Sequence, residues 1–385
     1  MSKNIGLINF HYSDSNYGAV LQAAALADII GGLGYLAEHI NYIPDEIEKK
    51  ITLRQRVVYA LEFLGVKKML KRLLRKKDYI KPIVVGKEVF EQFRNDWIAR
   101  SVRTYTNVAQ LDMIGDKYSI VIVGSDQVWR PNMFVNKNQD VNAYFLLFLP
   151  DSVTRVSYAA SFGVDYWEEG NNIELTRRVR AAMAKFKAVS VREKSGLAIC
   201  RDNFSIEAKH VLDPTLLSGA EFFEKVIASA GVKKQNNNLV YYKLDVDSEF
   251  ISEVNKIGRY YQVEVEDIYY KLDQVQGEYR YIPVAEWIAK IRDGRFIVTD
   301  SFHCVCLSIL FNKEFICVSN KMRGLARIQS LLDSLGIEGR LCDESLCLSD
   351  FSSSCKPIDY SLVNSRLNEL REESKLFLTN AIVNN

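Results

Sequence analysis

Side chains capable of acid–base and anion chemistry stand close together near residue 300. The stretch Phe296-Ile-Val-Thr-Asp-Ser-Phe-His303 opens with apolar residues that predict a short buried strand, and it closes on Asp300, Ser301 and His303. The apolar run 304–311 predicts a helix. A helix N-terminus offers unpaired N–H groups and a positive dipole end, which suit a phosphate or carboxylate. His303 therefore lies where an active site is readily built. The alternative is a histidine packed at a strand end, with Asp300 or Ser301 capping the helix.

A second polar cluster follows a predicted strand at 118–123. Its members are Ser125, Asp126, Gln127 and Trp129. The first three side chains can hydrogen-bond sugar hydroxyls, and the tryptophan ring can stack on a sugar face. The alternative is a turn at a strand end with a buried tryptophan, which this segment alone would favour.

Two more strand ends carry candidate binding groups. The predicted strand 188–192 ends on Arg192, whose guanidinium suits bidentate binding of a carboxylate or phosphate. A surface salt bridge with Glu193 is the alternative. Near the N-terminus, a strand at 5–10 leads into a turn-rich loop that ends Asn16-Tyr17-Gly18 at the start of a predicted helix. This loop lacks the glycine-rich dinucleotide fingerprint.

The elements that must position these groups alternate between strands and helices. This rhythm predicts an α/β protein of two Rossmann-like, doubly wound domains that face a cleft. Residues 1–230 form the expected N-terminal domain, residues 239–345 the C-terminal domain, and residues 346–385 a C-terminal extension and helix. The polar segment 231–238 is the expected linker. Facing domains would bring the strand-end clusters into one cleft.

Residues 46–98 interrupt the alternation with a helical insertion. Its stretch 67–81 is strongly basic, with Lys67, Lys68, Lys71, Arg72, Arg75, Lys76, Lys77 and Lys81. One interpretation is the solvated basic face of an ordinary helix. The other is a surface helix that rests on an anionic membrane or grips a pyrophosphate-linked substrate.

Composition bounds the class of protein. The chain has 385 residues and a net charge of +2, which does not indicate a nucleic-acid binder. Its seven cysteines form no CxxC pair, which favours a reduced, cytosolic setting and argues against a zinc site. No apolar run approaches the length of a membrane-spanning helix, and the N-terminus does not resemble a signal peptide. With no trio of carboxylates apparent, we expect chemistry that needs no metal.

Taken in order along the chain, the motifs resemble those of the polysaccharide pyruvyl transferase family. They are Ile8-Asn-Phe-His, Asn16-Tyr-Gly-Ala-Val-Leu-Gln22, Val123-Gly-Ser-Asp-Gln-Val-Trp129, Val189-Ser-Val-Arg-Glu193, Val211-Leu-Asp-Pro-Thr215, and Thr299-Asp-Ser-Phe-His303 with Phe311-Asn-Lys313. The resemblance spans about residues 5–340. It implies a fold like that of B-type (GT-B) glycosyltransferases. It also implies transfer of pyruvate from phosphoenolpyruvate to two hydroxyls of one sugar, giving a cyclic ketal and free phosphate.

The resemblance also implies roles for individual residues. His303 matches the family's active-site histidine, the expected proton-transfer residue, and Arg192 matches the arginine that holds phosphoenolpyruvate. The phosphoenolpyruvate-binding set becomes Arg192, Ser301, Phe302, His303 and Arg323. The acceptor-sugar set, in the N-terminal domain, becomes Asn16, Tyr17, Gly18, Ser125, Asp126, Gln127 and Trp129.

The chain departs from the family pattern beside the histidine. Some relatives carry an arginine two positions before it, where this chain has Ser301. Arg323 or Arg327 is the candidate to replace that anion-binding group. Many relatives carry glycine after the histidine, where this chain has Cys304.

The expected partners follow from the resemblance. Phosphoenolpyruvate is the co-substrate and no other cofactor is expected. The acceptor belongs to a bacterial surface polysaccharide or its precursor, on a lipid or nucleotide carrier. Such an enzyme would work in the cytoplasm, where residues 67–81 would rest on the inner membrane leaflet if the acceptor is lipid-linked. A homo-oligomer is compatible with the resemblance. Two alternatives remain: a GT-B type glycosyltransferase using a nucleotide sugar, and a non-catalytic family member, which Ser301 and Cys304 make conceivable.

Overall fold

The computed structural model describes residues 4–45, 82–135, 137–320, 324–343 and 347–383. The basic segment 67–81 and most of the predicted insertion lie outside the described residues, as does Arg323. Of the segment 46–98, the described part forms β3 (Val84–Val85) and α4 (Glu88–Trp97).

The N-terminal half is built on a parallel sheet of five strands, in the order β2-β1-β4-β5-β6. Its strands are β1 (Asn4–Ile8), β2 (Leu36–His39), β4 (Ile120–Val123), β5 (Thr154–Ser157) and β6 (Phe186–Ala188). Every residue of β4, Ile-Val-Ile-Val, is buried. Such a continuous apolar run is typical of a parallel strand that is covered on both faces.

Helices and short strands complete this half. The helices are α1 (Tyr17–Gly32), α4, α5 (Val108–Leu111), α6 (Lys137–Tyr144), α7 (Ile173–Met183), α8 (Lys194–Ile199), α9 (Pro214–Ser218) and α10 (Ala220–Ser229). Short helical turns are η1 (Asp112–Ile114), η2 (Pro131–Met133) and η3 (Cys200–Phe204), and a parallel strand pair is β7 (Ser190–Val191) with β8 (Lys209–His210). Asn16 caps α1, since its side chain accepts the Ala19 N–H.

The C-terminal half repeats the plan, with a second five-stranded parallel sheet in the order β10-β9-β13-β14-β15. Its strands are β9 (Leu239–Tyr242), β10 (Val265–Asp267), β13 (Phe296–Thr299), β14 (Phe315–Val318) and β15 (Leu341–Cys342). Its helices are α11 (Ser248–Tyr261), α12 (Val284–Asp293), α13 (Phe302–Leu310), α14 (Leu325–Leu335), η5 (Glu338–Arg340), α15 (Leu348–Ser354) and α16 (Tyr360–Val383). A hairpin of β11 (Tyr270–Asp273) and β12 (Glu278–Tyr281) pairs with β3.

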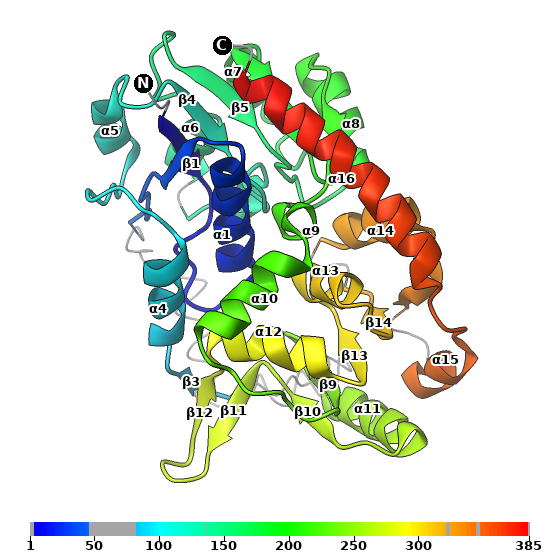
Figure 1. Ribbon diagram of the computed structural model, residues 1–385. Coiled ribbons are helices and arrows are strands. Elements are labelled where there is room, and N and C mark those ends of the chain that lie inside the picture. The colour runs from blue at the N-terminus through cyan, green and yellow to red at the C-terminus, as the bar shows by residue number, and fades with distance from the viewer. Residues whose placement is uncertain (1–3, 46–81, 136, 321–323, 344–346, 384–385) are drawn as a thin grey trace, which may run out of the picture.

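The two parallel sheets confirm the predicted α/β class and its two Rossmann-like halves (Figure 1). The expected linker region lies between α10 and β9, where residues 232–238 form neither helix nor strand. None of the helices in the described ranges is long and apolar enough to cross a membrane.

One apolar core is shared by the two halves, and each half also has a core of its own. Val20 and Leu21 of α1 belong to the same buried cluster as Trp287 of α12 and Phe302 and Val305 of α13. Here the packing across the boundary fixes the first helix of one half against the helices of the other.

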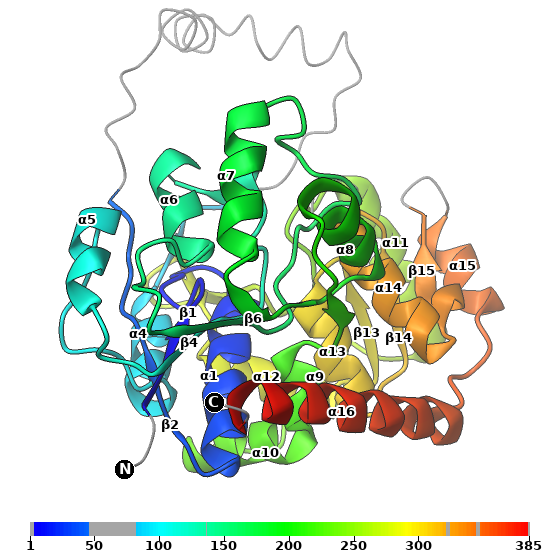
Figure 2. The same cartoon turned by 90° about the horizontal axis from the view of Figure 1, so that it is seen from above.

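Helix α16 ties the halves together a second time (Figures 1 and 2). Its first turns bury Val363 and Leu367 in the shared core. Its last turns bury Leu378 and Ile382 beside Ile5 in a cluster of the N-terminal sheet. The C-terminal helix therefore crosses back over the N-terminal half.

Tyr17 lies at the centre of the contact between the halves. Its ring stacks on Trp287 at 4.6 Å between centroids, with 5° between the planes. Its hydroxyl donates to the Ile282 carbonyl at 2.8 Å and accepts the Ile282 N–H at 3.0 Å. The predicted role of Tyr17 in sugar binding is therefore wrong, because the ring is fully buried and both sides of its hydroxyl are engaged.

Replacing Tyr17 with Phe should lower the free energy of unfolding by about 1–2 kcal/mol, because the buried N–H and C=O of Ile282 lose their partner. Denaturant unfolding followed by circular dichroism measures the change. The matched control is Tyr166→Phe, since the Tyr166 side chain is 60% exposed and its change should be negligible. If Tyr17→Phe were as stable as the parent chain, the hydroxyl would not be joining the two halves.

Candidate active site

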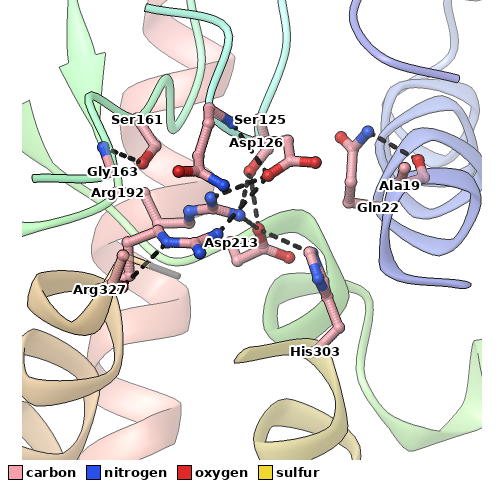
Figure 3. A network of polar contacts seen from close by, with 12 residues as sticks. Ala19, Gln22, Ser125, Asp126, Ser161, Gly163, Arg192, Asp213, His303 and Arg327 are labelled. Carbon is pink, nitrogen blue, oxygen red and sulfur yellow. Dashed lines mark hydrogen bonds and ion pairs between the residues drawn. The ribbon is translucent and has the colours of Figure 1, made fainter. Parts of the chain in front are cut away.

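Side chains from four segments that are distant in sequence meet in one polar network (Figure 3). Ser125 and Asp126 follow β4, Arg192 follows β7, Asp213 precedes α9, and His303 stands in the first turn of α13. Because the carboxyl ends of parallel strands line one edge of each sheet, facing sheets bring these side chains together. The polar contacts thus join residues from three of the four clusters that the sequence singled out, and they add Asp213.

His303 is held between the two halves. The residue is 4% exposed, and its Nε2 lies 3.7 Å from Asp213 Oδ2, close enough for an ion pair when the ring is protonated. On its other side the ring touches α1, where a Cβ added to Gly18 would come within 2.0 Å of His303 Nδ1. Only glycine at this position leaves room for the imidazole. Gly18 therefore shapes the histidine site.

Asp213 is the centre of the polar network. Its Oδ2 accepts the Ser125 hydroxyl at 2.6 Å and Arg192 Nη1 at 2.8 Å, while Oδ1 accepts the Thr215 N–H at 2.9 Å. Burial alone would favour the neutral acid. Interactions with His303, Arg192 and the Ser125 hydroxyl outweigh it and hold the pKa of Asp213 well below its usual range, so that the group stays a carboxylate.

The motif Val211-Leu-Asp-Pro-Thr215 was recognised in the sequence, but Asp213 was not chosen as a site residue. An aspartate before a proline reads locally as a helix N-cap, and Asp213 does cap α9. Only the fold shows that its second oxygen faces the histidine. The signal available in the sequence was the place of this aspartate, close behind a short predicted strand.

Arg192 lies inside the network and not on the surface. Its guanidinium reaches Asp213 through Nη1 and Asp126 through Nη2, the latter at 3.2 Å. It also lies over the Phe302 ring, with its carbon 4.6 Å from the ring centroid. The alternative of a surface salt bridge with Glu193 is wrong, because the Glu193 carboxylate is fully buried and accepts the N–H groups of Phe162 and Gly163. Arg192 therefore serves first to hold two carboxylates in place.

Asp126 adopts a backbone conformation that most residues avoid. Its φ of +80° lies in the left-handed region, which aspartate tolerates better than most residues. The turn lets Oδ1 accept the Gln127 N–H while facing Arg192, and Arg327 Nη1 of α14 lies 3.6 Å from the same oxygen. Such strained positions occur at functional sites where the surroundings hold them.

The residues before His303 organise the start of α13. Ser301 stands at the N-cap position, but its side chain makes no capping bond. Its N–H donates to Thr299 Oγ1 at 3.0 Å. Asp300 does not cap the helix either. It joins neighbouring strand ends, accepting the Leu244 N–H at 3.3 Å and the Asn320 amide at 3.1 Å. The first turn of α13 is therefore left without a side-chain cap at the edge of the network.

The predicted sugar-binding role of Trp129 is wrong. Its ring is fully buried, stacked on Phe145 at 5.3 Å, and its Nε1 donates to the Tyr144 carbonyl at 3.1 Å. The alternative of a buried tryptophan at a strand-end turn is the one that the structure supports. The other members of the acceptor set divide by exposure: Ser125, Asp126 and Gln127 are buried, and Asn16 is exposed.

Within the described ranges, no group of three or more His, Cys, Asp or Glu side chains is placed to hold a metal ion. The network offers acids, guanidinia and one imidazole. That chemistry suits proton transfer and the binding of a small anion.

Arg192→Ala should lower the free energy of unfolding by about 3–5 kcal/mol, because it leaves Asp126 and Asp213 as buried carboxylates without their main cation. Chemical denaturation at neutral pH measures the loss. Arg177→Ala removes an arginine whose side chain is 76% exposed and should leave stability unchanged. Equal stability of the two variants would contradict the buried network.

Three solved structures resemble the chain at low sequence identity. A UDP-GlcNAc 2-epimerase from Methanocaldococcus jannaschii, solved with UDP-GlcNAc and UDP, is 9% identical, with each chain covered over 100% and a TM-score of 0.49. The S. aureus MnaA–UDP structure is 9% identical over 97% of this chain and 90% of that one, with a TM-score of 0.48. The spinosyn forosaminyltransferase SpnP is 12% identical over 97% and 95%, with a TM-score of 0.43.

No curated protein was found to match the chain. The family model described as polysaccharide pyruvyl transferase matches residues 16–322, which include every residue of the network around Asp213 except Arg327. The match begins at the Asn16-Tyr17-Gly18 segment and continues past His303. The chain therefore belongs to the polysaccharide pyruvyl transferase family.

Proposed function

We propose that this protein transfers pyruvate from phosphoenolpyruvate to two hydroxyls of one sugar in a bacterial surface polysaccharide or its precursor. The product is a cyclic ketal and inorganic phosphate. The family match over residues 16–322 is the observation that carries the proposal. The buried network of His303, Asp213 and Arg192 supports it, because the reaction needs a proton donor and positive charge near a small anion.

In the proposed mechanism His303 delivers a proton to the methylene carbon of phosphoenolpyruvate. The neighbouring carbon, which carries the phosphate oxygen, becomes cationic and is attacked by a sugar hydroxyl. The carbon–oxygen bond to phosphate then breaks, and a second hydroxyl closes the ring. Each of the two sugar hydroxyls loses one proton. One of them restores the proton that His303 gave to the new methyl group, and the other leaves on the phosphate, so that the reaction balances without an oxidant or reductant.

Asp213 is proposed to position His303. A buried carboxylate 3.7 Å from Nε2 can pair with the ring when it is protonated and so orients it. Arg192 and Ser125 in turn hold Asp213. Ser301, Phe302 and Arg323 belong to the proposed phosphoenolpyruvate side, and the exposed Asn16 to the acceptor side. We propose a cytoplasmic enzyme, and a lipid-linked acceptor would bring it to the inner leaflet of the membrane.

His303→Gln should abolish acceptor-dependent phosphate release, with a fall of at least about 100-fold, since a positioned general acid contributes on the order of 10²–10⁴. The assay measures phosphate released from phosphoenolpyruvate with galactose-, mannose- and glucose-containing acceptors on lipid or nucleotide carriers. Normal folding with unchanged release would exclude His303 as the proton donor. Binding of nucleotide sugars without any binding of phosphoenolpyruvate would favour a glycosyltransferase instead.

Gly18→Ala should lower turnover strongly, because its new methyl group would overlap the His303 ring. Gly31→Ala is a matched control in the same helix, where a Cβ would meet nothing within 4 Å. Helix propensity favours alanine at both positions by up to about 1 kcal/mol, so the two substitutions differ chiefly in the contact with His303. Full activity in Gly18→Ala would show that the tight contact between α1 and α13 does not matter for catalysis.

A further inference from the structure

A second guanidinium lies against the same aromatic ring as Arg192. The Arg327 carbon is 5.7 Å from the centroid of Phe302, and that of Arg192 is 4.6 Å away. The Arg327 side chain is only 8% exposed. Figure 3 shows Arg327 reaching from its helix toward Arg192 and Asp126. Two buried cations thus lie beside the first turn of α13.

The position of Arg327 is fixed by contacts one helical turn further along α14. Ser330 accepts the Lys194 N–H at 3.0 Å and lies 3.4 Å from His210 Nε2, which also lies 3.1 Å from the Arg192 carbonyl. Residues three apart share a helix face, so Arg327 faces the N-terminal half together with Ser330. The two arginines are therefore held at a defined separation by backbone-linked contacts.

Bringing these cations together has an electrostatic cost. Burial and the nearby charge of Arg192 lower the pKa of Arg327 to about 10. The guanidinium is still protonated at neutral pH, but its charged form is less stable than that of an exposed arginine. Asp126 offsets part of this, with its Oδ1 3.6 Å from Arg327 Nη1. A further anion bound beside the two guanidinia would offset more, and the buried setting would strengthen the attraction.

Further features beside the arginines point to a ligand. His303 Nε2 faces Asp213 Oδ2 at 3.7 Å, and neither it nor the buried Arg192 Nε makes a hydrogen bond among the residues that the structure describes. Buried polar atoms are rarely left in this state unless a ligand or water completes them. The nine-residue helix α13 also directs the N-terminal end of its dipole here, with no side-chain cap from Ser301.

We propose that Arg327 is an anion-binding residue of the donor subsite. With Arg192 and the first turn of α13, it receives a small ligand that carries two anionic groups, as phosphoenolpyruvate does. The inference rests on the proposed function and adds to it the second guanidinium that a doubly anionic donor requires.

Titration calorimetry with phosphoenolpyruvate, without acceptor, tests the assignment. Arg327→Gln should weaken binding by at least about tenfold, because it removes a buried charge-assisted contact. Arg327→Lys should fall between Gln and the parent chain, since it keeps the charge but loses the planar fork. Arg177→Gln removes the same charge from an exposed position and should bind as the parent chain does. In steady-state assays the KM for phosphoenolpyruvate should rise while that of the acceptor stays unchanged.

The outcomes distinguish the role of Arg327 from the identity of the donor. Binding by Arg327→Gln within twofold of the parent chain overturns the role of Arg327 and leaves pyruvyl transfer standing. A parent chain that binds no phosphoenolpyruvate overturns the donor itself. Thermal unfolding of every variant is measured first. If Arg327→Gln does not fold, the Arg327→Lys variant decides the role of Arg327. An affinity of Arg327→Lys for phosphoenolpyruvate equal to that of the parent chain would show that no bidentate contact is lost, and it would overturn the assignment.

Discussion

The rest of the structure depends on the buried ion pairs of Arg192 with Asp126 and Asp213. Isolated charges are not tolerated in a protein interior, so each of these groups requires the others. Their pairing fixes the turn after β4, the end of β7 and the start of α9 in one place. The same carboxylate of Asp213 faces His303, so the network that stabilises the N-terminal half also reaches the histidine of the C-terminal half.

A second constraint is the close approach of α1 and α13. Gly18 leaves no gap beside His303, and Tyr17 of the same helix is hydrogen-bonded to the backbone of the C-terminal half. The shared core and α16 extend this contact over both sheets. Groups held by packed elements on both sides keep a defined geometry, which is what a catalytic proton donor needs. The histidine site is thus a product of the junction and not of either half alone.

Much of the fold could be predicted from the sequence because it is encoded locally. Apolar periodicity placed β13 and α13 within about two residues of their observed bounds. Residue type alone could not show which way a side chain points. Tyr17 and Trp129 carry rings that suit a sugar, yet both are fully buried. Asp213 looked like a helix cap, and its role depends on Arg192 and His303, which only the tertiary fold brings to it.

The most direct test of pyruvyl transfer follows the carbon itself. The chain is incubated with phosphoenolpyruvate labelled at its second carbon and with a saccharide acceptor, and the products are read by NMR. The account predicts that the label appears as a ketal carbon bonded to two sugar oxygens, with phosphate released in equal amount. Recovery of the label only as free pyruvate would contradict the account. So would label that stays in phosphoenolpyruvate although the chain binds it in the presence of a saccharide acceptor.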